Sequence, residues 1–246
     1  RIREVFGQWQ PELRAMNGLY APHLDEAVLE SMRRAGFKSL NRALISTAAS
    51  QLKRFARPDI RLDFDRVLHH ARRFTMDCVA YLIVGGPDQD PFASVGDLVY
   101  LAERRVLAGI SVFYPAPGSS DYEWCRRKQL LPHDPMLMRS TALPLAHVTD
   151  RDQTITLLRL GRLLNFIKKV IDCGDALPQP DKAPGTIDPK ADRKTVGRRL
   201  LAAFLQNGII YGMDTDGSVY RHAIDPSLTR RFLSACRKIS LKGAMG

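Results

Sequence analysis

The sequence predicts an α/β protein built on a parallel sheet. Between residues 11 and 115, short apolar runs alternate with segments that carry apolar residues at helical spacing. Each strand–helix unit takes about 30 residues, which is the length that a strand, a crossover helix and a second parallel strand require. The run at 78–84 is apolar at almost every position, as expected of a strand that is buried on both faces.

Local signals mark the ends of these elements. Gly36 is placed to end a helix, Pro58 stops a short helix, and Gly85 follows the most apolar strand. The expected strands are 11–19, 37–46, 78–84 and 109–114. The expected helices between them are 22–35, 50–55, 63–74 and 92–107. Four such units are too few to close an eight-stranded barrel of about 250 residues, so the sheet is open or further units precede it.

The character of the sequence changes after residue 120. Asp150 is placed to cap a long amphipathic helix over 151–172. Residues 174–192 hold four prolines, which indicates a linker or a disordered loop. The remaining expected elements are a helix over 195–204, a hairpin over 209–220 with an Asp-Gly turn, and a helix over 226–237.

Composition limits the classes of function. The net charge is +11, and residues 191–246 supply ten Lys/Arg against four Asp/Glu. Solvated helix faces explain this excess at least as well as a nucleic-acid partner, which we do not expect. No apolar run of about 18 residues is present, so we expect no membrane span. The four cysteines are far apart, without the spacing of a local metal site or a disulfide framework, so a reducing cytoplasm fits best.

Candidate binding residues lie where the expected strands end, because ligands of parallel α/β proteins bind at that edge. Glycines there allow close approach of the backbone, hydroxyls offer hydrogen bonds, and an arginine can clamp a carboxylate. An ordinary turn, a helix cap or a solvated arginine explains each position as well when it is taken alone. The positions are Asn17-Gly18, Ser46-Thr47, Arg57, Gly85-Gly86 and Tyr114-Pro115.

Four stretches in order resemble the later strands of radical S-adenosylmethionine (SAM) enzymes. They are NGLYAPHLDEAVLESMRRAGF at 17–37, SLNRALISTAASQLKRFARP at 39–58, YLIVGGPDQDP at 81–91 and FYPAPGSSDYEW at 113–124. The helix at 151–172 and the hairpin NGIIYGMDTDGSVYRH at 207–222 are similar to the tail of the subfamily that carries an upstream cobalamin-binding domain.

The resemblance implies the last four strands of a six-stranded partial (β/α) barrel with a mostly helical C-terminal extension. It divides the chain into the barrel part at 1–130, a connecting segment with a long helix at 131–173, a linker at 174–192 and an extension at 193–246. It also implies that SAM is bound by residues at the strand ends. These residues are Asn17, Ser46, Thr47, Arg57, Ile83, Gly85, Phe113 and Tyr114.

The implied cofactors are SAM, a 4Fe-4S cluster and, on the subfamily resemblance alone, cobalamin. The implied activity is reductive cleavage of SAM for methyl transfer or a radical rearrangement, with flavodoxin or ferredoxin as electron donor. The sequence departs from the pattern of radical SAM enzymes in two ways. Ile45 stands where many relatives carry Glu or Gln, and a CxxxCxxC loop is absent. Because residues 1–6 are typical of the end of a helix, we expect the chain to be part of a longer protein and to be inactive alone.

Two alternatives to this hypothesis stay open. One is a binding or regulatory module that kept the barrel surface without the cluster. The other is an RNA-modifying relative, prompted by the basic tail. The sequence does not identify the substrate.

Overall fold

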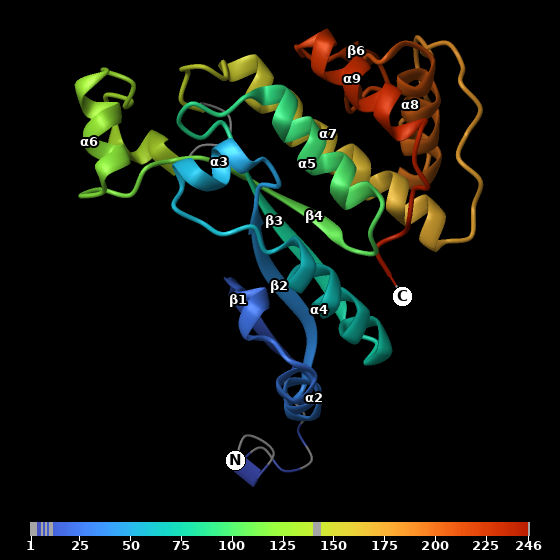
Figure 1. Cartoon of the computed structure of the whole chain (residues 1–246). Coiled ribbons are helices and arrows are strands. Elements are labelled where there is room, and N and C mark those ends of the chain that lie inside the picture. The colour runs from blue at the N-terminus through green and yellow to red at the C-terminus, as the bar shows by residue number, and fades with distance from the viewer. Residues whose placement is uncertain (1–3, 6, 8, 10–11, 140–143, 246) are drawn as a thin grey trace.

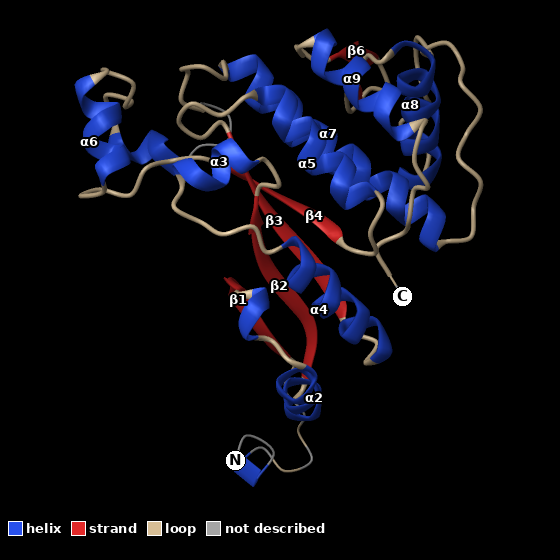
Figure 2. Cartoon of the chain, in the orientation of Figure 1, coloured by secondary structure: helices blue, strands red, loops and turns tan. Residues whose placement is uncertain are grey.

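A four-stranded parallel sheet forms the centre of the computed structural model, which describes residues 4–5, 7, 9, 12–139 and 144–245. The strands lie side by side in chain order, as Figure 1 and Figure 2 show. They are β1 (Leu13–Leu19), β2 (Phe37–Ile45), β3 (Asp77–Val84) and β4 (Leu107–Val112). Every neighbouring pair is parallel, which confirms the predicted class of sheet.

The last strand begins two residues earlier than predicted, and the helix before it is shorter. That helix, α5 (Pro91–Ala102), was expected to reach residue 107, whereas Leu107 already pairs with Val79 of β3. An apolar residue at this position suits either a helix face or a strand, so periodicity alone misplaced the boundary.

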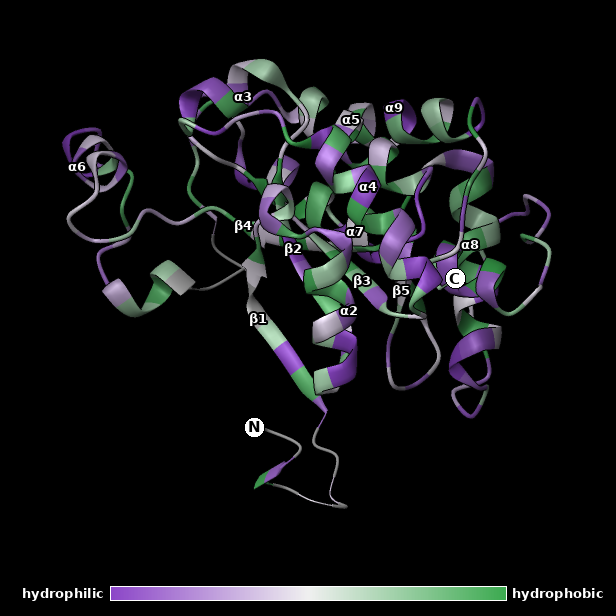
Figure 3. Cartoon of the chain, turned by 60° about the horizontal axis from the view of Figure 1, so that its bottom comes forward, coloured by the Kyte–Doolittle hydropathy of each residue, from purple (hydrophilic) through white to green (hydrophobic). Residues whose placement is uncertain are grey.

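Three helices cover one face of the sheet. They are α2 (Glu26–Ala35), α4 (Arg61–Arg73) and α5, and hydrophilic and hydrophobic residues alternate along them in Figure 3. The expected helix at 22–35 is broken into the 3-10 turn η1 (Ala21–His23) and α2, because the Asp25 carboxylate accepts from Val28 N and caps a new helix. The short α3 (Ala49–Arg54) lies beyond the carboxyl ends of the strands (Figure 1).

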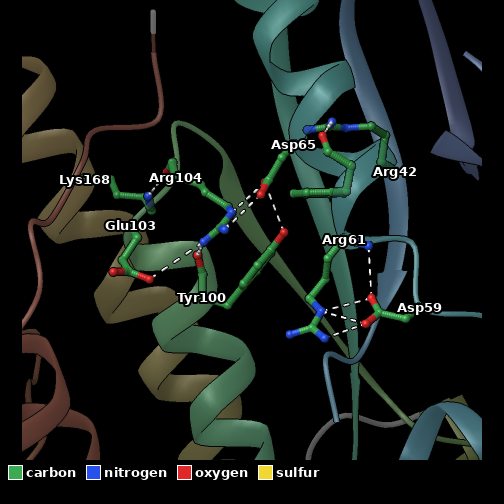
Figure 4. A network of polar contacts seen from close by, with 9 residues as sticks. Arg42, Asp59, Arg61, Asp65, Tyr100, Glu103, Arg104 and Lys168 are labelled. Carbon is green, nitrogen blue, oxygen red and sulfur yellow. Dashed lines mark hydrogen bonds and ion pairs between the residues drawn. The ribbon is translucent and has the colours of Figure 1, made fainter. Parts of the chain in front are cut away.

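Polar contacts fix the helices on this face to one another (Figure 4). Asp65 of α4 accepts hydrogen bonds from Arg104 and from the Tyr100 hydroxyl, and the Arg104 guanidinium lies 3.4 Å from the Tyr100 ring centroid. Arg42 of β2 is fully buried under α4, where it donates to Phe64 O and stacks on the Phe64 ring. Burial lowers the pKa of Arg42.

The opposite face of the sheet carries Val79, Tyr81 and Ile83 of β3, which are half-buried. The ring of Tyr81 lies over Gly109, where an added Cβ would be 2.6 Å from the ring. At the β4 edge of the sheet, the long helix α7 (Arg151–Asp172) packs against β4 and α5, and its Asn165 amide binds both the N–H and the carbonyl of Ala108 at 2.8 Å. The Asn165 side chain thus binds backbone groups of β4 that would otherwise pair with a further strand. The other edge strand of the sheet is β1.

In the C-terminal part, three of the described helices were predicted from the sequence, whereas one α-helix and one 3-10 helix were not. Asp150 caps α7 with a capping box to Gln153, as expected. α8 and α9 follow the predicted ranges closely, whereas α6 was missed. The elements here are α6 (Ser120–Arg127), η2 (Pro135–Arg139), α8 (Arg193–Asn207), β5 (Tyr211–Met213), β6 (Val219–Arg221) and α9 (Pro226–Cys236).

Part of the proline-rich segment is tied to the hairpin. Ile187 N donates to Gly217 O at 2.9 Å, Val219 N donates to Gly185 O, and Ile187 is buried. A Cβ on Gly217 would lie 2.1 Å from Ile187 O, so only glycine allows this approach. Residues 174–192 therefore have a defined course, although they form no helix.

One hydrophobic core connects the sheet with the extension. It contains Leu82 of β3, Leu98 of α5, Leu160 of α7, Phe204 of α8 and Phe232 of α9. The sheet, the long helix and the C-terminal extension therefore contribute to the same core. None of the described helices is long and apolar enough to cross a membrane.

Candidate functional site

The carboxyl ends of the four strands lie together at one end of the sheet, which we call the rim. Its loops are 18–20, 45–48, 85–90 and 113–118. Parallel pairing places them together, and Phe113 N extends the ladder by donating to Val84 O at 2.9 Å. The predicted strand-end positions therefore share one side of the molecule. Asn17 lies in β1, and its side chain is outside the part that the structure describes.

Ser46 and Thr47 are held by a buried carboxylate that the sequence analysis missed. The Oδ1 atom of Asp97, on α5, accepts from Thr47 N at 2.6 Å and from Thr47 Oγ1 at 2.7 Å. Its Oδ2 atom accepts from Ser46 Oγ at 2.8 Å, and Ser46 Oγ accepts from Ala48 N. Burial raises the pKa of Asp97, and the hydrogen bonds from Thr47 and Ser46 oppose this shift.

This network limits what Ser46 and Thr47 can bind. Both hydroxyl protons and the Thr47 amide already point at Asp97, so a ligand carboxylate at these groups would have to displace a protein carboxylate. An ionised carboxylate only accepts hydrogen bonds, so Asp97 can take all three of these donors at once. Ligand binding by Ser46 and Thr47 remains a prediction, and their observed contacts are to Asp97.

The backbone is strained immediately before this network. Ile45 has φ of 71°, and Ser46 N donates to Leu44 O at 2.9 Å, which closes a three-residue turn around Ile45. Left-handed backbone is unusual for a β-branched residue and costs about 1–3 kcal/mol, so the surroundings must hold it. The strand register also shifts between Ala43 and Ile45. Asp97 thus holds in place a rim loop that departs from ordinary strand geometry.

The loop after β3 is closed by its own side chain. Gln89 is buried, its Oε1 accepts from Gly86 N at 2.8 Å, and its Nε2 donates to Ile83 O at 2.9 Å. Gly85 has φ of +72°, and an added Cβ would lie 2.8 Å from Thr154 Oγ1 of α7. Glycine is therefore required at 85 by conformation and by space.

His147 is a second rim residue that the sequence analysis missed. Its Nε2 lies 2.7 Å from Gly85 O, so this nitrogen carries a proton and donates. The Trp124 ring meets the imidazole edge to face, and Thr149 Oγ1 donates to Gln89 O. No motif marked His147, because its contact to Gly85 spans 62 residues.

Three buried polar atoms around the Gly85-Gly86 loop have no hydrogen-bond partner among the described residues. They are Gln51 Nε2, His147 Nδ1 and Thr154 Oγ1. A Cβ on Gly86 would lie 3.0 Å from the first of them, and Gly85 is in contact with the other two residues. Unsatisfied buried polar atoms are few in native proteins, so a group of them indicates a place where a polar ligand or water completes the bonding.

The other predicted residues divide into two groups. Phe113 is half-buried, its ring lies 6.1 Å from that of Phe55, and burial raises the pKa of Tyr114. With Ile83 they give the rim an apolar part. Arg57 is exposed, and its backbone N–H donates to Leu52 O. The structure therefore brings together the apolar and glycine positions, whereas Arg57 stays in solvent.

The described residues do not suit an iron–sulfur cluster. Across 4–5, 7, 9, 12–139 and 144–245, no three His, Cys, Asp or Glu side chains converge as metal ligands. Cys78 and Cys125 are buried, Cys173 is exposed and Cys236 is half-buried, all as free thiols. A Cys-ligated cluster needs thiolates gathered at one point, which these four are not.

Comparison with known proteins adds no family: no family model matches the chain, and no curated protein matches it.

Proposed function

We propose that this chain is the later part of a radical SAM-type (β/α) barrel and that its rim binds the nucleoside of SAM. The observation that carries the proposal is the order of the sheet. Four parallel strands follow one another as β1-β2-β3-β4, with candidate loops at one edge. In a barrel each new strand is added on the same side of the one before it, as it is here. In a doubly wound sheet the direction in which strands are added reverses at a switch point.

The position of the helices supports the same architecture. α2, α4 and α5 lie together on one face, where Arg73 of α4 pairs with Glu26 of α2, and Arg104 pairs with Asp65 of α4. Tyr81 and Gly109 on the other face are half-buried, and among the described residues α2, α4 and α5 do not pack on that face, as the inner face of a barrel requires.

The rim residues fit a nucleoside better than they fit its amino-acid part. Phe113 and Ile83 are half-buried and offer apolar contact to a base. The unsatisfied atoms of Gln51, His147 and Thr154 offer polar contacts. An apolar slot with a few polar groups is the usual composition of such a site. Radical chemistry would require a cluster, and under this proposal its ligands come from another segment of the protein.

A second candidate is a nucleoside-binding module that performs no SAM cleavage. It is favoured by Asp97, which occupies the hydroxyls of Ser46 and Thr47, and by the lack of converging metal ligands in the described residues. In that function the rim binds the ligand without transforming it.

The experiment uses the protein expressed from its complete reading frame, reconstituted anaerobically with iron and sulfide and supplied with a reductant. We expect formation of 5′-deoxyadenosine from SAM. Phe113→Ala should weaken SAM binding, and the matched variant Phe37→Ala, at the other end of the sheet, should not. An upstream reading frame without CxxxCxxC, or a reconstituted protein that leaves SAM intact while still binding it, overturns the first candidate in favour of the second.

A further inference from the structure

A large cavity lies at the opposite end of the sheet from the rim. Its volume is about 850 Å³, and it opens beside Asp77 and Leu107, the first residues of β3 and β4. One side of α7 and the start of α8 form its other walls. This volume is within the range of small-molecule sites, which is about 300–1,000 Å³.

The walls of the cavity are mainly apolar. Phe166 and Val170 of α7 line it together with Leu107 and Met245. Leu107 is 37% exposed and Met245 is 55% exposed, so large apolar groups face solvent at this place. The Phe166 ring is fixed by contact with α8, because a Cβ on Gly197 would lie 2.4 Å from it. The apolar surface is therefore preformed on packed helices.

Cations without an acidic partner surround this apolar surface. Arg162, Lys169 and Arg193 line the cavity and are exposed, and none of them takes part in an ion pair within the described part of the chain. Asp77 is one of two carboxylates in the lining, and the other is Asp172.

The two other charged groups of the lining are already engaged. Lys194 pairs with Asp175 at 2.6 Å. Asp172 accepts from Ala244 N at 2.9 Å and from Met245 N, and it thereby fixes the C-terminal residues as a wall of the cavity. Three cations without an ion pair among the described residues thus share the lining with the carboxylates of Asp77 and Asp172.

We propose that this cavity binds an amphipathic anion, with an apolar body of about the size of a medium-chain acyl group and a carboxylate head. The apolar body would lie against Phe166, Val170 and Leu107, where burial of each CH₂ contributes about 0.8 kcal/mol. The head would be bound by Arg162, Lys169 and Arg193, for which the described residues supply no ion-pair partner. This site is independent of the rim, because it lies at the amino ends of the strands.

Equilibrium dialysis of labelled dodecanoate against the chain tests the proposal. We expect saturable binding of one equivalent, which the double variant Arg162→Gln/Lys169→Gln weakens about tenfold, since charge-assisted hydrogen bonds are lost. The control Arg33→Gln removes an exposed cation on α2 and should leave binding unchanged. Dodecanol should bind more weakly than dodecanoate.

Cys173 gives a second readout that locates the ligand. This exposed thiol lines the cavity, whereas Cys78 and Cys125 are buried. Dodecanoate should therefore slow alkylation of Cys173 by a small maleimide. Equal binding of dodecanol, equal binding by the double variant, no saturable binding, or no protection of Cys173 would each overturn the proposal.

Discussion

The single residue Asp97 fixes the rim loop after β2 through hydrogen bonds to residues that are distant in the sequence. It is 2% exposed, lies on α5, and binds the loop after β2 through Ser46 and Thr47, about 50 residues earlier in the chain. The strained turn at Ile45 immediately precedes these bonds. Asp97 accepts three charge-assisted hydrogen bonds from this loop. Together they stabilise the loop by more than the strained backbone of Ile45 destabilises it.

Replacing Asp97 by alanine should destabilise the protein by about 2–4 kcal/mol, because Thr47 N and two hydroxyls then lose their acceptor. Asp97→Asn keeps an oxygen for Thr47 and an amide for Ser46, so it should cost clearly less. Urea denaturation measures both variants. Equal losses for alanine and asparagine would show that the carboxylate oxygens do not hold the loop.

At the scale of elements, the edge of the sheet depends on close contact between α7 and β4. Gly161 of α7 faces Ile110, and an added Cβ would lie 2.3 Å from Ile110 Cγ1. The Asn165 amide binds Ala108 of the same strand. A glycine and an asparagine in one helix thus allow it to lie where a further strand would pair.

Gly161→Ala should therefore destabilise the protein by about 1–3 kcal/mol through overpacking. Ile110→Ala should also be destabilising alone, but the double variant should lose about 1–2 kcal/mol less than the sum, because removing Cγ1 makes room for the new methyl group. Gly96→Ala is the matched control, since nothing lies within 4 Å of its added Cβ. Thermal unfolding of the four variants checks this, and strict additivity contradicts the contact.

The elements also show what could be predicted from sequence. The alternation of strands and helices is a local pattern, and it gave four parallel strands with ends within two residues of those observed. α6 has few apolar residues, so periodicity did not reveal it. Asp97 stood out only as an acid in the otherwise apolar helix α5, and its partners are distant in sequence. Contacts of this kind depend on the packing of α5 over β2, which no local pattern encodes.

At the scale of the whole molecule, the C-terminal residues are fastened to the centre by a buried lysine. Lys168 of α7 is fully buried, and its Nζ donates to Arg104 O at 2.6 Å and to Lys242 O at 2.9 Å (Figure 4 shows the contact to Arg104). Burial lowers the pKa of Lys168 to about 8, although nearby Asp172 opposes the shift.

This shift predicts the pH dependence of stability. Between about pH 8 and the ordinary lysine value of 10.5, Lys168 is neutral in the folded protein and still charged in the unfolded chain. Unfolding then takes up a proton, so raising the pH through this range stabilises the folded state, by up to about 3 kcal/mol. Denaturation of the native protein and Lys168→Met at several pH values measures the difference. A difference that stays constant from pH 7 to 10 would contradict the shift.

Amide chemical shifts of the labelled chain report most directly on whether the rim binds the nucleoside of SAM. Titration with SAM to millimolar concentration should move the signals of Thr47, Gly85, Gly86, Phe113 and Tyr114, and leave those at the amino ends of the strands in place. Shifts that are absent at the rim, or that gather at Asp77 and Leu107 instead, would contradict the account.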